Sequence, residues 1–256
     1  MSITKLYKKY NMNLKKILKK MQFDFLIVGS AKCGTTGIHR CLRSHPDIYM
    51  PSLESGINGE TGFFLSDLKD TVKGLTSQKI STNIGKITKN YNGEKIIGER
   101  STDYTKKPYR SVEIEKIKEE TKIIFSYRNP IERIRKMYNH HLKNEPRYTK
   151  DNFEKENTEY YIKTSMLYYQ MKPYFEKFDE ICVVNIESEN ERISKGNAKF
   201  IGVEPEKISL SYENVNKSFN SDIKIPDSKK KALLEDFKKF KNYIERSRVT
   251  HVSKQK

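Results

Sequence analysis

Short apolar runs that alternate with longer polar stretches constrain the fold of this 256-residue chain more than any other feature. Four such runs are bounded by turn-forming residues, and they span residues 23–29, 95–98, 122–127 and 181–186. Between them, apolar residues recur at helical spacing, most clearly over residues 131–142, 160–178 and 191–201. Buried strands that alternate with helices are typical of a mainly parallel sheet with both faces covered. The sequence therefore predicts an α/β fold with a central, mainly parallel sheet flanked by helices.

A single domain is expected for residues 23–256, because the length suits one α/β core and no internal repeat is present. Residues 1–22 are basic and partly amphipathic, so we expect a solvated lead-in helix there. They lack the apolar core of a secretory signal, and no stretch of the chain is long enough to cross a bilayer. Residues 227–256 are lysine-rich with apolar residues on one side, which predicts an amphipathic helix with a polar end.

The charge balance favours an anionic partner. The chain contains 50 Lys and Arg residues against 33 Asp and Glu, which gives a formal net charge of +17. A membrane surface, an acidic polymer and a phosphorylated small molecule fit this charge, whereas no recognition module supports nucleic acid. The three cysteines, Cys33, Cys41 and Cys182, match no metal-ligand spacing and favour a reducing, cytoplasmic setting.

The first candidate site is the loop GSAKCGTTGIHR, which follows the first apolar run. Gly29 and Gly34 allow a tight turn and a close approach of the backbone to an anion. A helix is expected from Thr35, where free N–H groups and the helix dipole favour phosphate. In a Walker-type loop the lysine follows the second glycine, whereas here Lys32 lies inside the loop. We predict a phosphate-binding site formed by Ser30, Ala31, Lys32, Cys33, Gly34, Thr35 and Thr36.

The second candidate segment is YRNPIERIRKMYNHHL, which follows a later apolar run. Arg128 comes directly after the predicted strand, and Pro130 suits the first position of a helix. Cations near a helix start oppose its dipole, yet this start contains Arg133, Arg135 and Lys136. A bound anion explains them, since arginine binds phosphate well, although a solvated basic face also fits Arg135 and Lys136. Because the carboxyl ends of parallel strands share one edge, both segments are expected to border one crevice.

In these motifs the chain resembles the sulfotransferases that use 3′-phosphoadenosine 5′-phosphosulfate (PAPS), in the branch of heparan-sulfate-type and bacterial enzymes. That family has a loop F-x-I-x-G-x-x-K-x-G-T-T, matched by residues 25–36, and a following helix that ends in H-P, matched by His45 and Pro46. Its R-[ND]-P-x-x-R segment is matched by residues 128–133. GERSTDY and ICVVNIESE…KFIGV resemble its later motifs, so the resemblance extends over roughly residues 23–203.

The resemblance implies that a sulfuryl group passes from PAPS to a hydroxyl or amine acceptor, with release of adenosine 3′,5′-bisphosphate (PAP) and without a metal. Lys32 would neutralise charge on the bridging oxygen, helped by the loop N–H groups, Thr35 and Thr36. The acceptor is expected to be a glycan, another carbohydrate or a small molecule, while tyrosyl peptides and lipids stay open.

A glutamate in a K-E-x-x-[FY]-F segment acts as the general base in this branch. GETGFF puts Glu60 at that position, with Gly59 in place of the lysine. Glu54 is the alternative base, because it lies at the more usual distance from the His-Pro pair. The weaker candidates for the base are His39, His140 and His141.

A second departure from the family concerns the 3′-phosphate. The family has a serine eight residues after its first arginine, whereas this chain has Lys136, which can bind phosphate as a point charge beside Arg128. In the segment NVNKSFN, Lys217 is predicted to contact the nucleotide from a closing loop. Ser101 and Tyr104 either border the acceptor pocket or have structural roles.

Two other functions remain open at this stage. A P-loop kinase is disfavoured by the position of Lys32 and by the lack of a convincing aspartate for magnesium at a strand end. A nucleotide-binding protein of the same fold without activity is compatible with the departures at Gly59 and Lys136.

Overall fold

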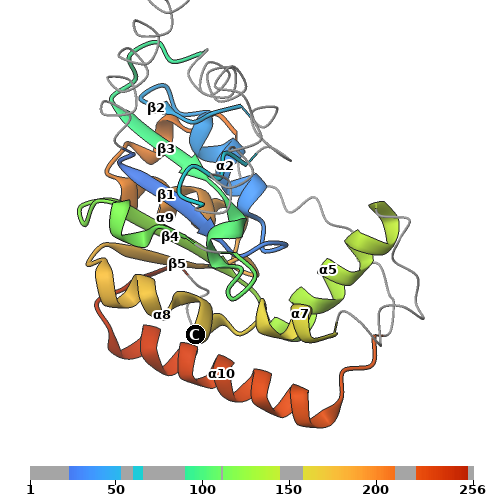
Figure 1. Cartoon of the computed structure of the whole chain (residues 1–256). Coiled ribbons are helices and arrows are strands. Elements are labelled where there is room, and N and C mark those ends of the chain that lie inside the picture. Colours follow the sequence, from blue (N-terminus) through green and yellow to red (C-terminus); the bar gives the residue numbers. More distant parts are fainter. Residues whose placement is uncertain are drawn as a thin grey trace, which may run out of the picture.

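A six-stranded parallel sheet forms the centre of the molecule in the computed structural model, which describes residues 23–52, 60–65, 90–110, 112–144, 158–210 and 223–252 (Figure 1). The strands are β1 (Phe25–Gly29), β2 (Ile48–Tyr49), β3 (Ile96–Arg100), β4 (Lys122–Tyr127), β5 (Ile181–Asn185) and β6 (Thr250–Val252). Their order across the sheet is β2-β3-β1-β4-β5-β6, and each neighbouring pair is parallel. The predicted α/β fold with a mainly parallel sheet is confirmed.

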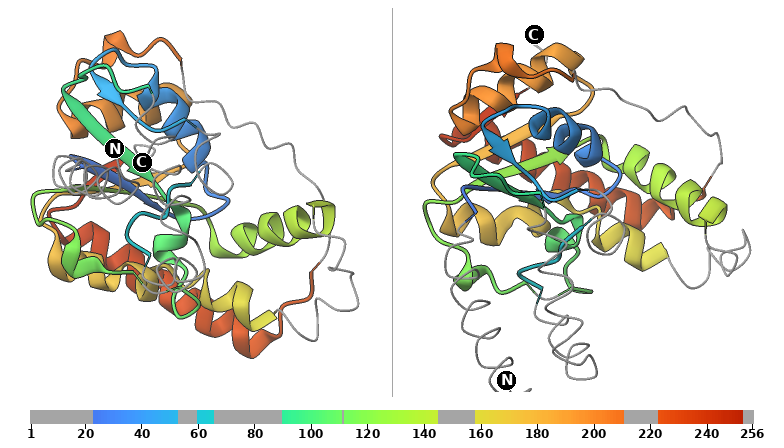
Figure 2. Two further views of the ribbon diagram at one scale, coloured as in Figure 1. Left: turned by 45° about the horizontal axis from the view of Figure 1, so that its top comes forward. Right: turned by 90° about the horizontal axis from the view of Figure 1, so that it is seen from above.

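Helices cover both faces of the sheet (Figure 2). The helices are α2 (Thr35–Arg43), α5 (Pro130–Asn144), α7 (Thr158–Lys163), α8 (Leu167–Lys177), α9 (Asn190–Ile201) and α10 (Asp227–Arg246). Short 3₁₀ turns accompany them in the described residues, namely η1 (Thr102–Thr105), η2 (Ile114–Lys116) and η4 (Pro205–Lys207). Helices α2 and α9 pack on one face and α8 and α10 on the other, while α5 and α7 lie beside the strand ends (Figures 1 and 2).

Strand β1 is apolar throughout because it contacts a core on each side. Leu26 and Val28 belong to the cluster that includes side chains of α8 and α10. Phe25 and Ile27 alternate with them and pack against side chains of α2 and α9. All four side chains are fully buried, so the run shows no polar alternation. This burial fixes the direction of β1 and therefore the position of the loop that follows it.

Two of the predicted helices have different bounds in the structure. The expected helix over residues 160–178 is divided into α7 and α8, which are separated by residues 164–166. There the hydroxyl groups of Thr164 and Ser165 donate hydrogen bonds to carbonyls of α7, which helps to end it. The expected helix over residues 227–256 ends at Arg246, and residues 250–252 form β6, since they pair with β5.

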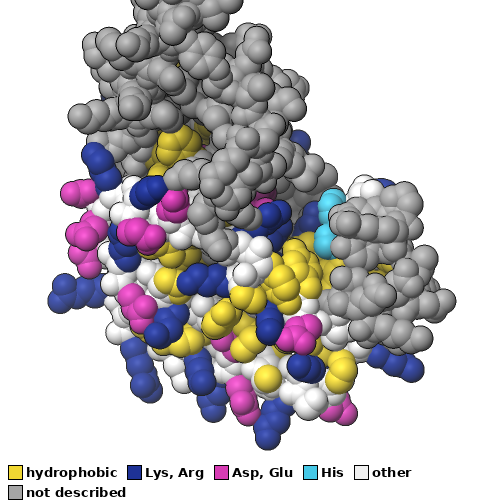
Figure 3. Space-filling model, in the orientation of Figure 1, with side chains coloured by type: hydrophobic (Ala, Val, Ile, Leu, Met, Phe, Trp, Pro, Cys, Tyr) yellow, Lys and Arg dark blue, Asp and Glu magenta, His cyan; other side chains and the backbone are white. Residues whose placement is uncertain are grey.

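The described residues also show the state of the cysteines, the character of the helices and the distribution of surface charge. Cys33, Cys41 and Cys182 are buried and not disulfide-bonded. None of the described helices is long and apolar enough to cross a membrane. On the face seen in Figure 3, Lys and Arg side chains are spread among Asp and Glu rather than gathered in one patch. The predicted lead-in segment 1–22 lies outside the described residues.

Candidate active site

The loop between β1 and α2 has the backbone geometry of an anion-binding turn. Gly34 adopts a left-handed φ of 72° and is the N-cap of α2, which begins at Thr35. No side chain caps this helix, so its first N–H groups face the loop without a side-chain acceptor. A Cβ atom at Gly29 would lie 2.2 Å from the Thr105 hydroxyl oxygen, so only glycine fits there. The turn can therefore present backbone N–H groups to an anion.

Lys32 lies in this loop among other charged groups. Its φ of 63° is unusual for a residue with a side chain, and such conformations cluster at functional sites. Burial, together with the nearby cations Lys106, Arg133 and Arg100, lowers the pKa of Lys32 to about 8, whereas Glu60 opposes them. An anion bound beside Lys32 would compensate this excess of positive charge.

Arg100 connects the end of β3 to the start of α2. One of its terminal nitrogens, Nη1, donates a hydrogen bond to the Thr36 hydroxyl at 3.1 Å and to the Thr35 hydroxyl at 3.4 Å. The same nitrogen lies 3.5 Å from the Glu60 carboxylate. The sequence prediction did not include Arg100, although the residue stands in GERSTDY, at the carboxyl end of the predicted strand. Its position at the sheet edge was the available signal.

Glu60 is held at the same edge by two further contacts. Its carboxylate accepts hydrogen bonds from the Thr102 N–H at 2.8 Å and from the Thr102 hydroxyl at 2.7 Å. Glu60 therefore lies next to Arg100 and acts electrostatically on Lys32. The structure thus brings together the predicted base and the predicted lysine. The alternative base, Glu54, lies outside the described residues.

Ser101 and Tyr104 are fully buried and have structural contacts. The Ser101 hydroxyl donates to Glu99 at 2.6 Å and accepts from the Gly62 N–H at 2.7 Å. The Tyr104 hydroxyl accepts from the Phe64 N–H at 3.1 Å. Of the two predicted roles, these contacts favour the structural one, because they fasten residues 60–65 to the end of β3.

Arg128 and Lys136 lie together at the beginning of α5. Arg128 follows β4 and is 6% exposed, and its Nε has no hydrogen-bond partner within the described part of the chain. Burial lowers the pKa of Lys136, and the positive charge of Arg128 lowers it further, so the two cations are close. A buried donor without a partner, next to a second cation, fits an anionic ligand. Lys217, the third predicted contact, lies outside the described residues.

The other cations on α5 point elsewhere. Arg133 is 1% exposed and donates from Nε to the hydroxyl of Ser30, the first residue of the loop, at 2.7 Å. Arg135 is exposed and pairs with Glu132, as expected for a solvated helix face. The sequence prediction treated these residues as one basic group, and the helix turn separates them.

The structure places the three candidate histidines on α2 and α5. His39 is 1% exposed within α2, where burial lowers its pKa to about 3. His141 contacts the Tyr161 hydroxyl, and the neighbouring His140 contacts Asn144 on the outer part of α5. These contacts do not link the histidines to Lys32 or Glu60, so they remain weaker candidates for the base.

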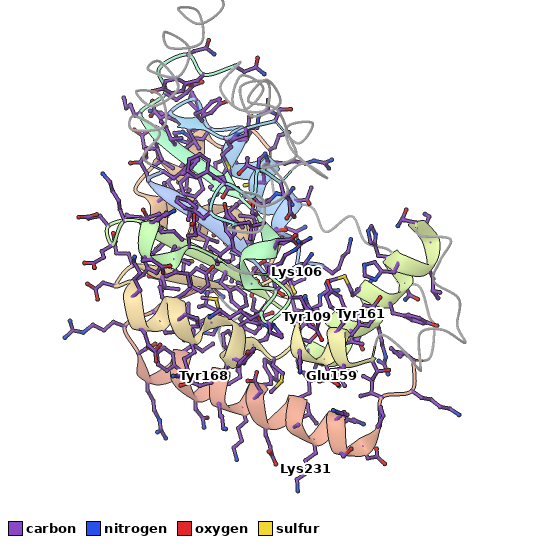
Figure 4. All side chains as sticks on the ribbon, viewed as in Figure 1. Lys106, Tyr109, Glu159, Tyr161, Tyr168 and Lys231 are labelled. Carbon is purple, nitrogen blue, oxygen red and sulfur yellow. The ribbon has the colours of Figure 1, made fainter. Side chains whose placement is uncertain are left out.

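A lysine and several tyrosines border the site on the side of α7. Lys106 and Tyr109, on the turn after η1, lie near Tyr161 (Figure 4), and the Tyr109 ring lies 4.9 Å from that of Tyr160. Burial lowers the pKa of Lys106, but Tyr160 and the ion pair with Asp103 outweigh this effect, and the net shift is upward. Lys106 therefore stays charged next to Lys32. The described residues contain no cluster of His, Cys, Asp or Glu placed to hold a metal ion.

Comparison with known proteins identifies the architecture. No protein-family model matches the sequence, and no curated protein matches it either. A crystal structure of a sulfotransferase from Alicyclobacillus acidocaldarius superposes with a TM-score of 0.61, covering 88% of this chain and 96% of that one. The chain has a sulfotransferase fold. Since the two sequences are 21% identical, this similarity defines the fold, and the roles of individual residues must be argued from the site.

Proposed function

We propose that this protein is a sulfotransferase that moves a sulfuryl group from PAPS to a hydroxyl or amine acceptor and releases PAP. The observation that carries the proposal is the meeting of Lys32, Arg100 and Glu60 at the uncapped start of α2. These groups supply an anion site and a carboxylate base within one small region. The sulfotransferase fold and the loop motif of residues 25–36 support the same function.

The residues present fit a nucleotide with two anionic ends. The loop N–H groups, Lys32 and Arg100 would hold the phosphosulfate end. The buried Nε of Arg128, which lacks a partner among the described residues, and the neighbouring Lys136 would hold the 3′-phosphate. PAPS supplies the activated sulfuryl group. We extend the proposal to residues 23–256 as one domain and to a carbohydrate or another small molecule as the acceptor.

The proposed chemistry assigns one role to each of three side chains. Glu60, oriented by Arg100 and Thr102, takes the proton from the acceptor hydroxyl while the oxygen of that hydroxyl forms a bond to sulfur. The bond between sulfur and the bridging oxygen breaks, and the electron pair stays on the phosphate. Lys32 and Arg100 then stabilise the negative charge on that phosphate, which is where preorganised cations act most strongly.

The proposal is tested by incubating the full-length protein with labelled PAPS and a panel of carbohydrate and small-molecule acceptors. Lys32→Ala should lower the transfer rate about a hundred- to a thousandfold. Glu60→Gln should lower it about a hundred- to ten-thousandfold and still bind PAP. Lys118→Ala and Glu119→Gln are matched controls, because both residues are exposed at the opposite edge of the sheet, before β4.

Three outcomes would contradict the proposal. Tight binding of PAP without transfer to any acceptor would favour a nucleotide-binding protein without activity. Magnesium-dependent turnover of ATP in place of PAPS would favour a kinase. Full transfer activity in Lys32→Ala or Glu60→Gln would leave the fold in place and remove the assignment of that residue.

A further inference from the structure

Arg133 is the most deeply buried cation near the candidate site. It lies in the first turns of α5, is 1% exposed, and donates from Nε to the hydroxyl of Ser30, the first residue of the loop, at 2.7 Å. On its other side, Nη1 donates to the Ser165 hydroxyl at 2.6 Å and lies 3.5 Å from the Thr164 hydroxyl. One guanidinium thus joins the loop to the junction between α7 and α8.

The hydroxyl groups around Arg133 are arranged to accept hydrogen bonds. Thr164 donates its own hydroxyl proton to the Tyr160 carbonyl at 2.8 Å, and Ser165 donates to the Tyr161 carbonyl at 2.6 Å. Their remaining lone pairs face Arg133. Hydroxyl groups have no net charge, so this arrangement satisfies the hydrogen bonds of the cation without neutralising it.

No carboxylate forms an ion pair with Arg133 within the described part of the chain; the groups that act on its charge are the Cys33 thiol and the Tyr160 phenol. Burial raises the pKa of the Cys33 thiol, so this neighbour stays neutral. A buried cation without a counter-charge costs free energy. An anion held by the loop in front of Arg133 would offset that cost.

We propose that Arg133 is a positioning residue for the sulfuryl donor: it fixes the loop from behind through Ser30 and places a positive charge beneath the bound phosphosulfate. The proposal rests on the proposed function. It assigns Arg133 to the phosphosulfate end of the nucleotide, whereas Arg128, from the same sequence motif, is proposed to hold the 3′-phosphate.

A structural arginine and a positioning arginine differ in their effect on Lys32. The charged groups that act on Lys32 come from each neighbouring element: Lys106 after η1, Glu60 beside β3, Arg100 at the end of β3, and Arg133 on α5. Removing the charge of Arg133 raises the pKa of Lys32. The pH at which nucleotide affinity falls should therefore move upward, whereas a loss of packing alone would leave that pH unchanged.

The test measures PAP binding by calorimetry as a function of pH for the full-length protein and three variants. Arg133→Gln should weaken binding about ten- to a hundredfold at neutral pH, the range for hydrogen bonds to a charged group, and should shift the alkaline fall to higher pH. Arg133→Lys keeps the charge and should recover part of the affinity. Arg135→Gln removes an exposed charge from the same helix and should bind like the wild type.

The outcomes separate this inference from the proposed function. If the wild type binds no PAP, the proposed function fails and the inference fails with it. If the wild type binds and a folded Arg133→Gln binds equally well with the same pH profile, only the inference is overturned. Should Arg133→Gln not fold, Ser30→Ala and Ser165→Ala keep the charge and remove its anchors. Weaker binding in these two variants supports the inference, and unchanged affinity in both overturns it.

Discussion

Nucleotide binding should depend on pH because Lys32 loses its proton within an accessible range. Burial and three neighbouring cations lower the pKa of Lys32 to about 8 in the free protein. A bound polyanion favours the protonated amine, so affinity is full below that pKa and falls as the pH rises through it. From the pKa of about 8, the protonated fraction is about ten in eleven at pH 7 and about one in eleven at pH 9. PAP should therefore bind about tenfold more weakly at the higher pH.

Calorimetry in buffers of different ionisation enthalpy measures the same linkage directly. At about pH 8, binding should take up about half a proton through Lys32. Lys32→Arg, which does not titrate in this range, should remove both the proton uptake and most of the pH dependence. Because burial and Arg128 also lower the pKa of Lys136, a Lys136→Arg variant separates its contribution. An affinity that stays constant between about pH 7 and about pH 9.5 in the wild type would refute the reasoning.

Three further predictions concern single residues. Arg100→Gln should lower the transfer rate at saturating PAPS about a hundred- to a thousandfold, because the contacts of Arg100 with Thr36 and Glu60 are lost. An unchanged rate in the transfer assay would contradict the proposed role of Arg100 in stabilising the leaving phosphate. Gly34→Ala should destabilise the fold by about 1–2 kcal/mol, since φ is 72° there, and a urea midpoint equal to that of the wild type would argue against this strain. Asp236→Ala should lower the free energy of unfolding by about 1–3 kcal/mol, because the carboxylate accepts hydrogen bonds from the N–H groups of Tyr168 and Tyr169 at the start of α8. Thermal or urea unfolding measures this change, and no loss of stability would show that water replaces the carboxylate.

The fold was largely predictable because its strands are buried on both faces. The continuous apolar runs that become β1, β4 and β5 need no knowledge of their partners to be recognised. Strand β6 was not predictable in this way: only Val252 within it is buried, and the strand exists because it pairs with β5. The boundary between α7 and α8 likewise depends on contacts with Arg133, which lies about thirty residues away in the sequence.

The candidate site was predictable where one segment contains both the turn and its charges. The loop, with Lys32 and Gly34, is such a segment. Arg100 was not predicted as a site residue, because its role depends on a hydrogen bond to Thr36, which lies on another element. Arg133 shares a sequence motif with Arg128, but the motif does not show that the Nε of Arg133 donates to Ser30, which lies about one hundred residues away in the sequence. Local patterns identified the segments, and tertiary contacts determined the partners.

The sheet order explains why buried cations gather at this loop. Strand β1 lies between β3 and β4, so the loop after β1 has a strand end on each side. One neighbouring strand ends in Arg100, and the other is followed by Arg128, which are 5% and 6% exposed. These charges are internal and differ from the Lys and Arg side chains that are spread over the face seen in Figure 3. Because salt screens exposed charges much more strongly than buried ones, we expect the three strand ends, rather than the overall charge, to determine which anion binds.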